Sequence, residues 1–110
     1  MALFKFVKGL KESKKIHLFN NGKHQRDFTY VKDVTYSIIK LINRIPKQKI
    51  PYRILNIGSN DPIKLKTFVK IIESFIGKKS KFEYLSLQQG DINKTHASNK
   101  EITRLIKFFP

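Results

Sequence analysis

Cysteine is absent from the 110-residue sequence, which excludes disulfides, thiolate catalysis and zinc sites built on cysteine. The three histidines, His17, His24 and His96, lack the spacing of metal ligands, so we predict no metal site. No apolar run approaches the length of a membrane span. The N-terminal MALFKFVKGLKESKK mixes lysine into its apolar run and has no small-residue cleavage site, unlike a signal peptide. We therefore expect a cytoplasmic protein without a membrane segment.

Acidic residues are scarce: 8 Asp and Glu stand against 23 Lys and Arg, for a net charge of +15. The excess is mostly lysine spread along the whole chain, together with much Ile and Asn, as expected of coding DNA rich in A and T. A nucleic-acid protein more often concentrates basic residues on one face and adds aromatic platforms. We predict only nonspecific contact with polyanions. A small basic protein that contacts nucleic acid is kept as the alternative function.

The length fits one domain with a hydrophobic core and is too short for two. Apolar residues at helical spacing alternate along the chain with short aromatic and β-branched runs, which predicts an α/β protein. Residues 1–110 are expected to form one partial domain. The predicted helices are 2–14, 34–45 (limited by Pro46), 65–76 (ended by Gly77) and one opened by a Ser98–Glu101 capping box; the predicted strands are 16–19, 28–31, 53–57 and 82–87.

The stretch NNGKHQRDFTYVKD, residues 20–33, organises the chain. Asn21-Gly22 favours a tight reversal, and Asp33 stands where a carboxylate can cap the following helix. Arg26 is held between the turn and the predicted strand 28–31, where its planar charged group suits a phosphate or carboxylate. The residues alone leave two interpretations open, a ligand site or a surface pair between Arg26 and Asp27.

The run RILNI at 53–57 is typical of a parallel strand buried on both faces. Three or four short strands make a poor sheet alone, and their edges need a partner. The predicted architecture is therefore incomplete by itself.

The segments MALFKFVKGL, HLFNNGKHQRDFTYVKDV, YRILNIGSNDPIKLKTFVKIIE and LQQGDINKTHAS resemble, in this order, the C-terminal third of the NAD-dependent epimerase/dehydratase family. These proteins are extended short-chain dehydrogenases that act on nucleotide sugars. The branch most similar is that of UDP-glucuronate 4-epimerases and capsular-polysaccharide epimerases. The resemblance implies a partial Rossmann-type fold, here its C-terminal substrate-binding lobe with a few short strands and four helices, and a UDP-sugar as ligand.

The resemblance also implies roles for single residues. Arg26 matches the arginine that reaches the UDP phosphates, Leu18 and Phe19 match the segment beside the uracil, and Asp91 matches the acidic residue near the nucleotide ribose. Two alternatives remain open: Phe19 is an ordinary residue of the hydrophobic core, and Asp91 serves only to form a turn in its loop. Asn56, Gly58 and Asp33 match architectural positions, where Asn56 ties a strand end to a loop, Gly58 permits a turn and Asp33 caps. The chain departs from the family at Gln89, Ser98 and Lys107, and Lys107 weakens the expected stop of the last helix.

Two features of family chemistry are missing from the sequence. The five glycines are isolated, so no glycine-rich strand-to-helix turn can receive the NAD pyrophosphate. Tyr36 and Lys40 match the spacing of the family's catalytic Tyr-x-x-x-Lys, but they lie on a predicted helix without a cofactor site, and we interpret the match as coincidence. We expect no catalytic residue and no cofactor bound by this chain alone; NAD is implied only for the complete family enzyme.

The sequence thus predicts the UDP-sugar-binding region of an epimerase, inactive alone. The chain is expected to be a separately encoded half that needs a Rossmann half, or else a decayed gene fragment. Without its partner we expect marginal stability or self-association.

Overall fold

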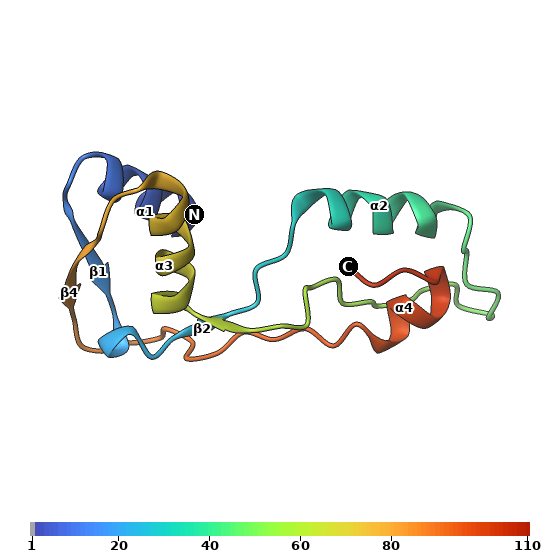
Figure 1. Cartoon of the computed structure of the whole chain (residues 1–110). Coiled ribbons are helices and arrows are strands. Elements are labelled where there is room, and N and C mark those ends of the chain that lie inside the picture. Colours follow the sequence, from blue (N-terminus) through green and yellow to red (C-terminus); the bar gives the residue numbers. More distant parts are fainter. Residues whose placement is uncertain (1) are drawn as a thin grey trace. The chain divides into compact units, whose positions relative to one another are not determined.

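The computed structural model describes residues 2–110 (Figure 1) and confirms an α/β protein with four helices and few strands. Among the described residues, contacts divide the chain into two compact units. Unit 1 comprises residues 2–26 and 63–94, and unit 2 comprises residues 27–62 and 95–110. The single partial domain expected over 1–110 stays a prediction. The elements are α1 (Ala2–Lys11), β1 (Lys15–Leu18), a 3-10 turn (Asn20–Gly22), β2 (Gln25–Arg26), α2 (Val31–Ile42), β3 (Ile63–Lys64), α3 (Leu65–Ile76), β4 (Lys81–Tyr84) and α4 (Lys100–Ile106).

Unit 1 is built on a parallel pair of strands, β1 and β4, with Lys15 opposite Lys81 and Leu18 opposite Tyr84. Helices α1 and α3 pack against each other, and α1 also contacts β1 (Figure 1). Successive side chains of a strand point to opposite faces, so Ile16 and Leu18 of β1 are buried and Lys15 and His17 are exposed. The hydrophobic core consists of Phe6, Leu10, Ile16, Leu18, Val69 and Ile72.

The end of α3 follows the prediction. Gly77 adopts the left-handed conformation with φ 72° and ends the helix at the C′ position. One turn earlier, the buried Glu73 accepts a hydrogen bond of 2.6 Å from the backbone N–H of Ser80, immediately before β4. This hydrogen bond, helped by the lysines nearby, lowers the pKa of Glu73. The Glu73 carboxylate therefore fixes the turn between α3 and β4.

A second, two-residue ladder lies elsewhere in unit 1. In it β2 pairs with β3 in antiparallel fashion, with Arg26 opposite Ile63. On the other side of β2, the backbone N–H of Gln25 donates to the carbonyl of Asn93 at 2.9 Å. The loop that carries residue 91 is thus held to the strand that carries Arg26.

Unit 2 contains α2, α4 and the segments around them. Ile102 and Ile106 of α4 are its buried apolar residues, and the rings of Tyr36 and Phe108 meet edge to face at 4.7 Å. In contrast, Ile38 and Ile42 of α2 are 52% and 64% exposed. The amphipathic stripe predicted for this helix is present but largely uncovered among the described residues.

The buried Asn99 and the carboxylate of Asp27 hold the loops of unit 2 together. The Asn99 amide exchanges two hydrogen bonds with the backbone of Gly58. Asp27 accepts hydrogen bonds from the backbone N–H groups of Ser59 (2.9 Å), Asn60 (3.2 Å) and Ala97 (2.9 Å). The residue beside Arg26 is therefore a structural anchor for two loops, not an ion-pair partner of Arg26.

Gly58 is required for its size, not for a turn. A Cβ at this position would overlap the Cβ of Ala97 and lie 3.0 Å from Oδ2 of Asp27. Asn56 is exposed, and the link to the loop that we assigned to it is made by Asn99. The architectural role expected of Gly58 is present for a different reason, whereas the role expected of Asn56 was wrong.

Four local predictions were wrong. Residues 28–31 are not a strand, because α2 already begins at Val31, and its N-cap is Tyr30. Asp33 therefore lies inside the first turn, where its charge still favours the helix N-terminus. Residues 53–57 form no strand, since they find no neighbouring strand among the described residues. The Ser98–Glu101 capping box is also absent, because α4 begins one residue later with Asn99 as its N-cap, without a side-chain cap.

The last helix ends as the family pattern requires, although its glycine is replaced. Lys107 takes the left-handed conformation itself, with φ 54°, and its backbone N–H donates to the carbonyl of Thr103. A left-handed non-glycine residue costs about 1 kcal/mol. No helix within residues 2–110 has the length and apolar character needed to cross a bilayer.

Candidate functional site

A pocket of about 260 Å³ in unit 1 brings together most of the predicted ligand residues. Its charged groups are two cations and one carboxylate, and its walls are apolar. The lining residues are Ala2, Lys5, Phe6, His17, Phe19, His24, Arg26, Leu65 and Asp91. Helix α1, the end of β1, β2, the start of α3 and the loop after β4 each contribute, so the site depends on the whole fold of unit 1.

Arg26 is anchored through three of its five N–H groups. Nη1 donates to the carbonyl of Gln25 at 2.9 Å and to that of Asn93 at 3.4 Å. Nη2 donates to Oδ1 of Asp91 at 3.0 Å. Arginine carries five donors in a rigid plane, so Nε–H and one Nη2–H have no partner among the described residues. The Arg26 side chain is 23% exposed and lines the pocket, so its guanidinium is a fixed cation with two donors left for a ligand.

Asp91 lies in the polar loop predicted after β4, directly after Gly90, whose φ of 81° reverses the chain. Its backbone N–H closes that turn on the carbonyl of Gln88. The two carboxylate oxygens face different side chains, because Oδ1 meets Arg26 and Oδ2 lies 3.4 Å from Nε2 of His24. Asp91 is therefore both a turn residue and a member of the pocket.

Phe19 and Leu18 occupy different environments although they are neighbours. The Phe19 ring is half-buried and lines the pocket. The Leu18 side chain is fully buried in the core, and its carbonyl accepts the backbone N–H of Leu85. The structure thus brings Phe19, Arg26 and Asp91 together, whereas Leu18 supports this wall from behind.

Sequence reasoning missed His24. His24 is only 1% exposed, although the sequence predicts a polar loop at this position. His24 and Arg26 stand two residues apart on a segment that becomes β2, and alternate residues of an extended segment point to the same side. That spacing was the available signal, but it was overlooked because the histidines were examined only as metal ligands.

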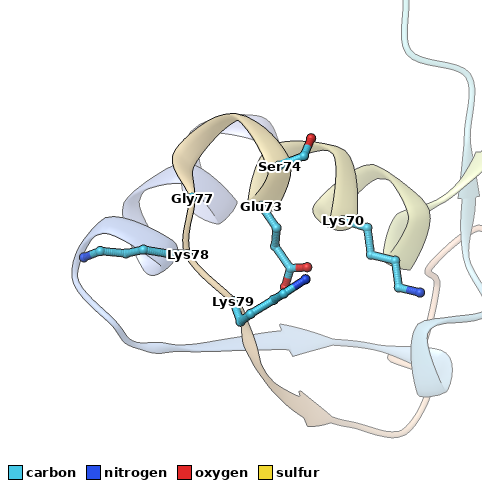
Figure 2. A pocket seen from close by; sticks show the side chains of 6 residues that line it. All are labelled: Lys70, Glu73, Ser74, Gly77, Lys78 and Lys79. Atoms are coloured by element: carbon cyan, nitrogen blue, oxygen red, sulfur yellow. The ribbon is translucent and has the colours of Figure 1, made fainter.

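A larger hollow of about 420 Å³ lies at the end of α3 (Figure 2). The side chains of Glu73 and Lys79 approach each other there, whereas Lys78 points away and its Nζ donates to the carbonyl of Lys11 at 3.0 Å. Glu73 already binds the backbone of Ser80. Glu73 and Lys78 are thus engaged in holding unit 1 together, and the lysines of this hollow are exposed.

The residues present do not fit NAD. Within residues 2–110 no strand is joined to the next α-helix by a glycine-rich turn. The connections from β2 to α2 and from β3 to α3 contain no glycine, and the long connection from β4 to α4 contains only Gly90, so no backbone cradle for a pyrophosphate forms in this range. Tyr36 and Lys40 stack on one face of α2, with Nζ 5.2 Å from the ring centre. That is an ordinary cation–π contact between i and i+4 residues. Within residues 2–110 no group of three or more His, Asp and Glu side chains is arranged to hold a metal ion.

Comparison with known proteins identifies the family. The model of the NAD dependent epimerase/dehydratase family matches residues 1–58, and the chain belongs to this family. Among curated relatives, the CapI protein of Staphylococcus aureus is 36% identical over the whole chain, which covers 37% of CapI. The UDP-glucuronate 4-epimerase of Thermodesulfobacterium geofontis is 33% identical and is covered to 33%. The chain spans about a third of the length of these relatives.

Solved structures show the same fold. A UDP-glucuronic acid 4-epimerase from Bacillus cereus, in complex with UDP-glucuronic acid and NAD, superposes with a TM-score of 0.87 at 24% identity. The match covers all of this chain and 34% of that one. A UDP-glucose 4-epimerase from Thermotoga maritima with bound UDP-glucose superposes with a TM-score of 0.82 at 19% identity, over 96% of this chain and 32% of that one. The extended short-chain dehydrogenase fold predicted from the sequence is confirmed.

Proposed function

We propose that this chain is the nucleotide-sugar-binding part of a UDP-sugar epimerase and that the pocket of unit 1 holds the UDP end of the substrate. The observation that carries the proposal is the Arg26 guanidinium, which is fixed by three protein acceptors and keeps two donors for a ligand. Membership of the epimerase family supports a nucleotide sugar as that ligand.

The chemistry of the pocket matches one end of such a ligand. Arg26 pairs with the diphosphate, because a planar guanidinium binds phosphate oxygens in pairs. Asp91 accepts hydrogen bonds from the ribose hydroxyls through the lone pairs that Arg26 leaves unused. Phe19 provides an apolar wall for the uracil. Leu18 contributes by holding the backbone of this segment in the core.

The size of the pocket limits what it binds. Sites that enclose a drug-sized ligand measure about 300–1,000 Å³, and this pocket has about 260 Å³. It therefore holds part of a UDP-sugar and leaves the sugar outside. The reacting carbon of the sugar accordingly needs groups from outside residues 2–110, which supply binding of the nucleotide.

The second part of the proposal is that a Rossmann half, separately encoded, completes the enzyme and carries NAD. Unit 2 supports this partner through its uncovered apolar side chains, since Ile42 is 64%, Ile45 is 73% and Ile54 is 85% exposed. A small domain rarely exposes so many large aliphatic residues without a partner. Residues 53–57, which find no strand neighbour within residues 2–110, are proposed to join the parallel sheet of that half.

Titration of the purified chain with UDP-glucuronate tests the function. We expect the amide resonances of Phe19, Arg26 and Asp91 to shift on binding, and UDP to compete. Glucuronate without the nucleotide serves as the control and is expected not to bind. Turnover of UDP-glucuronate by the chain and NAD alone would contradict the proposal that the chain binds the substrate without catalysing the reaction. Binding of glucuronate but not of UDP would contradict the proposal that the pocket holds the nucleotide.

A further inference from the structure

His24, which lies directly before β2, and Arg26, which lies on it, both approach the carboxylate of Asp91. His24 and Arg26 stand at alternate positions of the extended segment, and both line the same pocket. Arg26 Nη2 meets Oδ1 of Asp91 at 3.0 Å, and His24 Nε2 lies 3.4 Å from Oδ2. The two oxygens of Asp91 thus face a histidine and an arginine that stand two residues apart in the sequence.

The His24 imidazole is buried without being satisfied. Its side chain is 2% exposed, and Nε2 forms no hydrogen bond with any residue in the range 2–110. A buried polar nitrogen without a partner costs about 1–3 kcal/mol. Nε2 already lies 3.4 Å from Oδ2 of Asp91, so a small rotation of either side chain would align the two atoms for an N–H···O bond. An apolar side chain would fill this place at lower cost, so the imidazole requires an explanation.

We infer that His24 is a positioning residue of the nucleotide pocket: it holds the second oxygen of Asp91 opposite Arg26, and its charge strengthens binding of the nucleotide diphosphate. The inference rests on the function proposed above. It adds a residue to which the sequence analysis gave no role in binding, and a dependence of the affinity on pH. Histidine is the side chain whose charge ordinarily changes between about pH 5 and 8.

The charged groups around His24 determine the sign of this dependence. Asp91 faces it from the loop after β4, and Arg26 stands beside it on β2. Lys5 of α1 and His17 of β1 line the same pocket, and His17 is 55% exposed and paired with Glu83 at 3.5 Å. The leucine at the start of α3, Leu65, adds no charge. Protonation of His24 therefore raises the positive charge next to an anionic ligand, and affinity should fall as pH rises.

The ligand arm of the test uses UDP-glucose, because its doubly esterified diphosphate has no proton to lose in this range. We expect the chain to bind it about tenfold more tightly at about pH 5.5 than at about pH 8, because a histidine is ordinarily charged at the lower pH and neutral at the higher one. His24→Gln should bind with little dependence on pH. His17→Gln should retain the dependence, and its disappearance there would overturn the assignment to His24. His96→Gln, in unit 2, serves as the matched control with unchanged affinity.

The second arm needs no ligand. Nuclear magnetic resonance of the imidazole nitrogens of the unliganded chain is expected to show that Asp91→Asn shifts the His24 Nε2 resonance and leaves that of His96 in place. An unmoved His24 resonance overturns the inference even if His24→Gln fails to fold. A moved resonance without binding of UDP-glucose at either pH refutes the proposed function and the nucleotide role of His24, while the contact between His24 and Asp91 stands.

Discussion

Asp27 gives the sharpest stability prediction, because one carboxylate joins three backbone N–H groups from two loops of unit 2. Hydrogen bonds to a charged group contribute about 1.5–3 kcal/mol each. The bonds to Ser59 and Ala97 are partly buried, whereas the bond to Asn60 is exposed, where water can replace the carboxylate. Counting the two partly buried bonds, we expect Asp27→Ala to reduce the free energy of unfolding by about 3–5 kcal/mol.

Urea unfolding followed by circular dichroism measures this loss, and amide hydrogen exchange localises it. The amide protons of Ser59 and Ala97 should lose their protection in Asp27→Ala while the amides of β1 keep theirs. Asp61→Ala is the matched control, since Asp61 is an exposed aspartate in the same unit, and surface changes of this kind stay within about 0.5 kcal/mol. A loss below about 1 kcal/mol for Asp27→Ala would refute the reasoning.

Three further predictions concern Gly58, Glu73 and Ile42. Gly58→Ala should lower the free energy of unfolding by about 1–3 kcal/mol in urea titrations, because its Cβ would overlap the Cβ of Ala97. An unchanged midpoint of urea unfolding would show that the loop around Ala97 moves to make room, and would contradict this prediction. Because the pKa of Glu73 is lowered in the folded chain, its carboxylate stabilises the fold above about pH 4.3, and this stabilisation is lost as the pH falls through the lowered pKa. The melting temperature of Glu73→Gln should therefore approach that of the wild type in acid. A difference in melting temperature that stays the same at all pH values would contradict this. The chain alone should self-associate in sedimentation experiments, and Ile42→Lys should reduce the association. A wild-type chain that stays monomeric at high concentration would contradict the proposal that the exposed apolar side chains of unit 2 bind a partner.

Local sequence patterns predicted unit 1 well because its elements carry their own signals. The stripe of α1, the left-handed Gly77 and the Asn21-Gly22 reversal all depend on neighbouring residues, and each was found where predicted. Arg26 and Asp91 could be named from their motifs. Their direct contact at 3.0 Å joins residues 65 positions apart, and no local pattern encodes such a contact.

Unit 2 was predicted less well because its sequence is suited to more structure than residues 2–110 supply. The segment 53–57 has the composition of a buried parallel strand, but a strand needs a neighbour to pair with. The helix start at Val31 shows a different effect, since Phe28 and Tyr30 favoured a strand by composition while the acidic first turn with Asp33 favoured the helix. Ser98 was chosen as a cap by its pattern, but the buried Asn99, which also binds Gly58, fixed the start of α4 one residue later.

The most direct test of the central claim is the affinity of Arg26→Ala for UDP-glucuronate, measured by calorimetry beside Arg104→Ala. Arg104 is an exposed arginine on α4 that pairs with Glu101, so its loss should leave the affinity unchanged. Removal of Arg26 should weaken binding by about 1.5–3 kcal/mol, or roughly ten- to 150-fold, as for a hydrogen bond to a charged group. Equal affinity of Arg26→Ala and the wild type would contradict the claim that this pocket holds the nucleotide diphosphate.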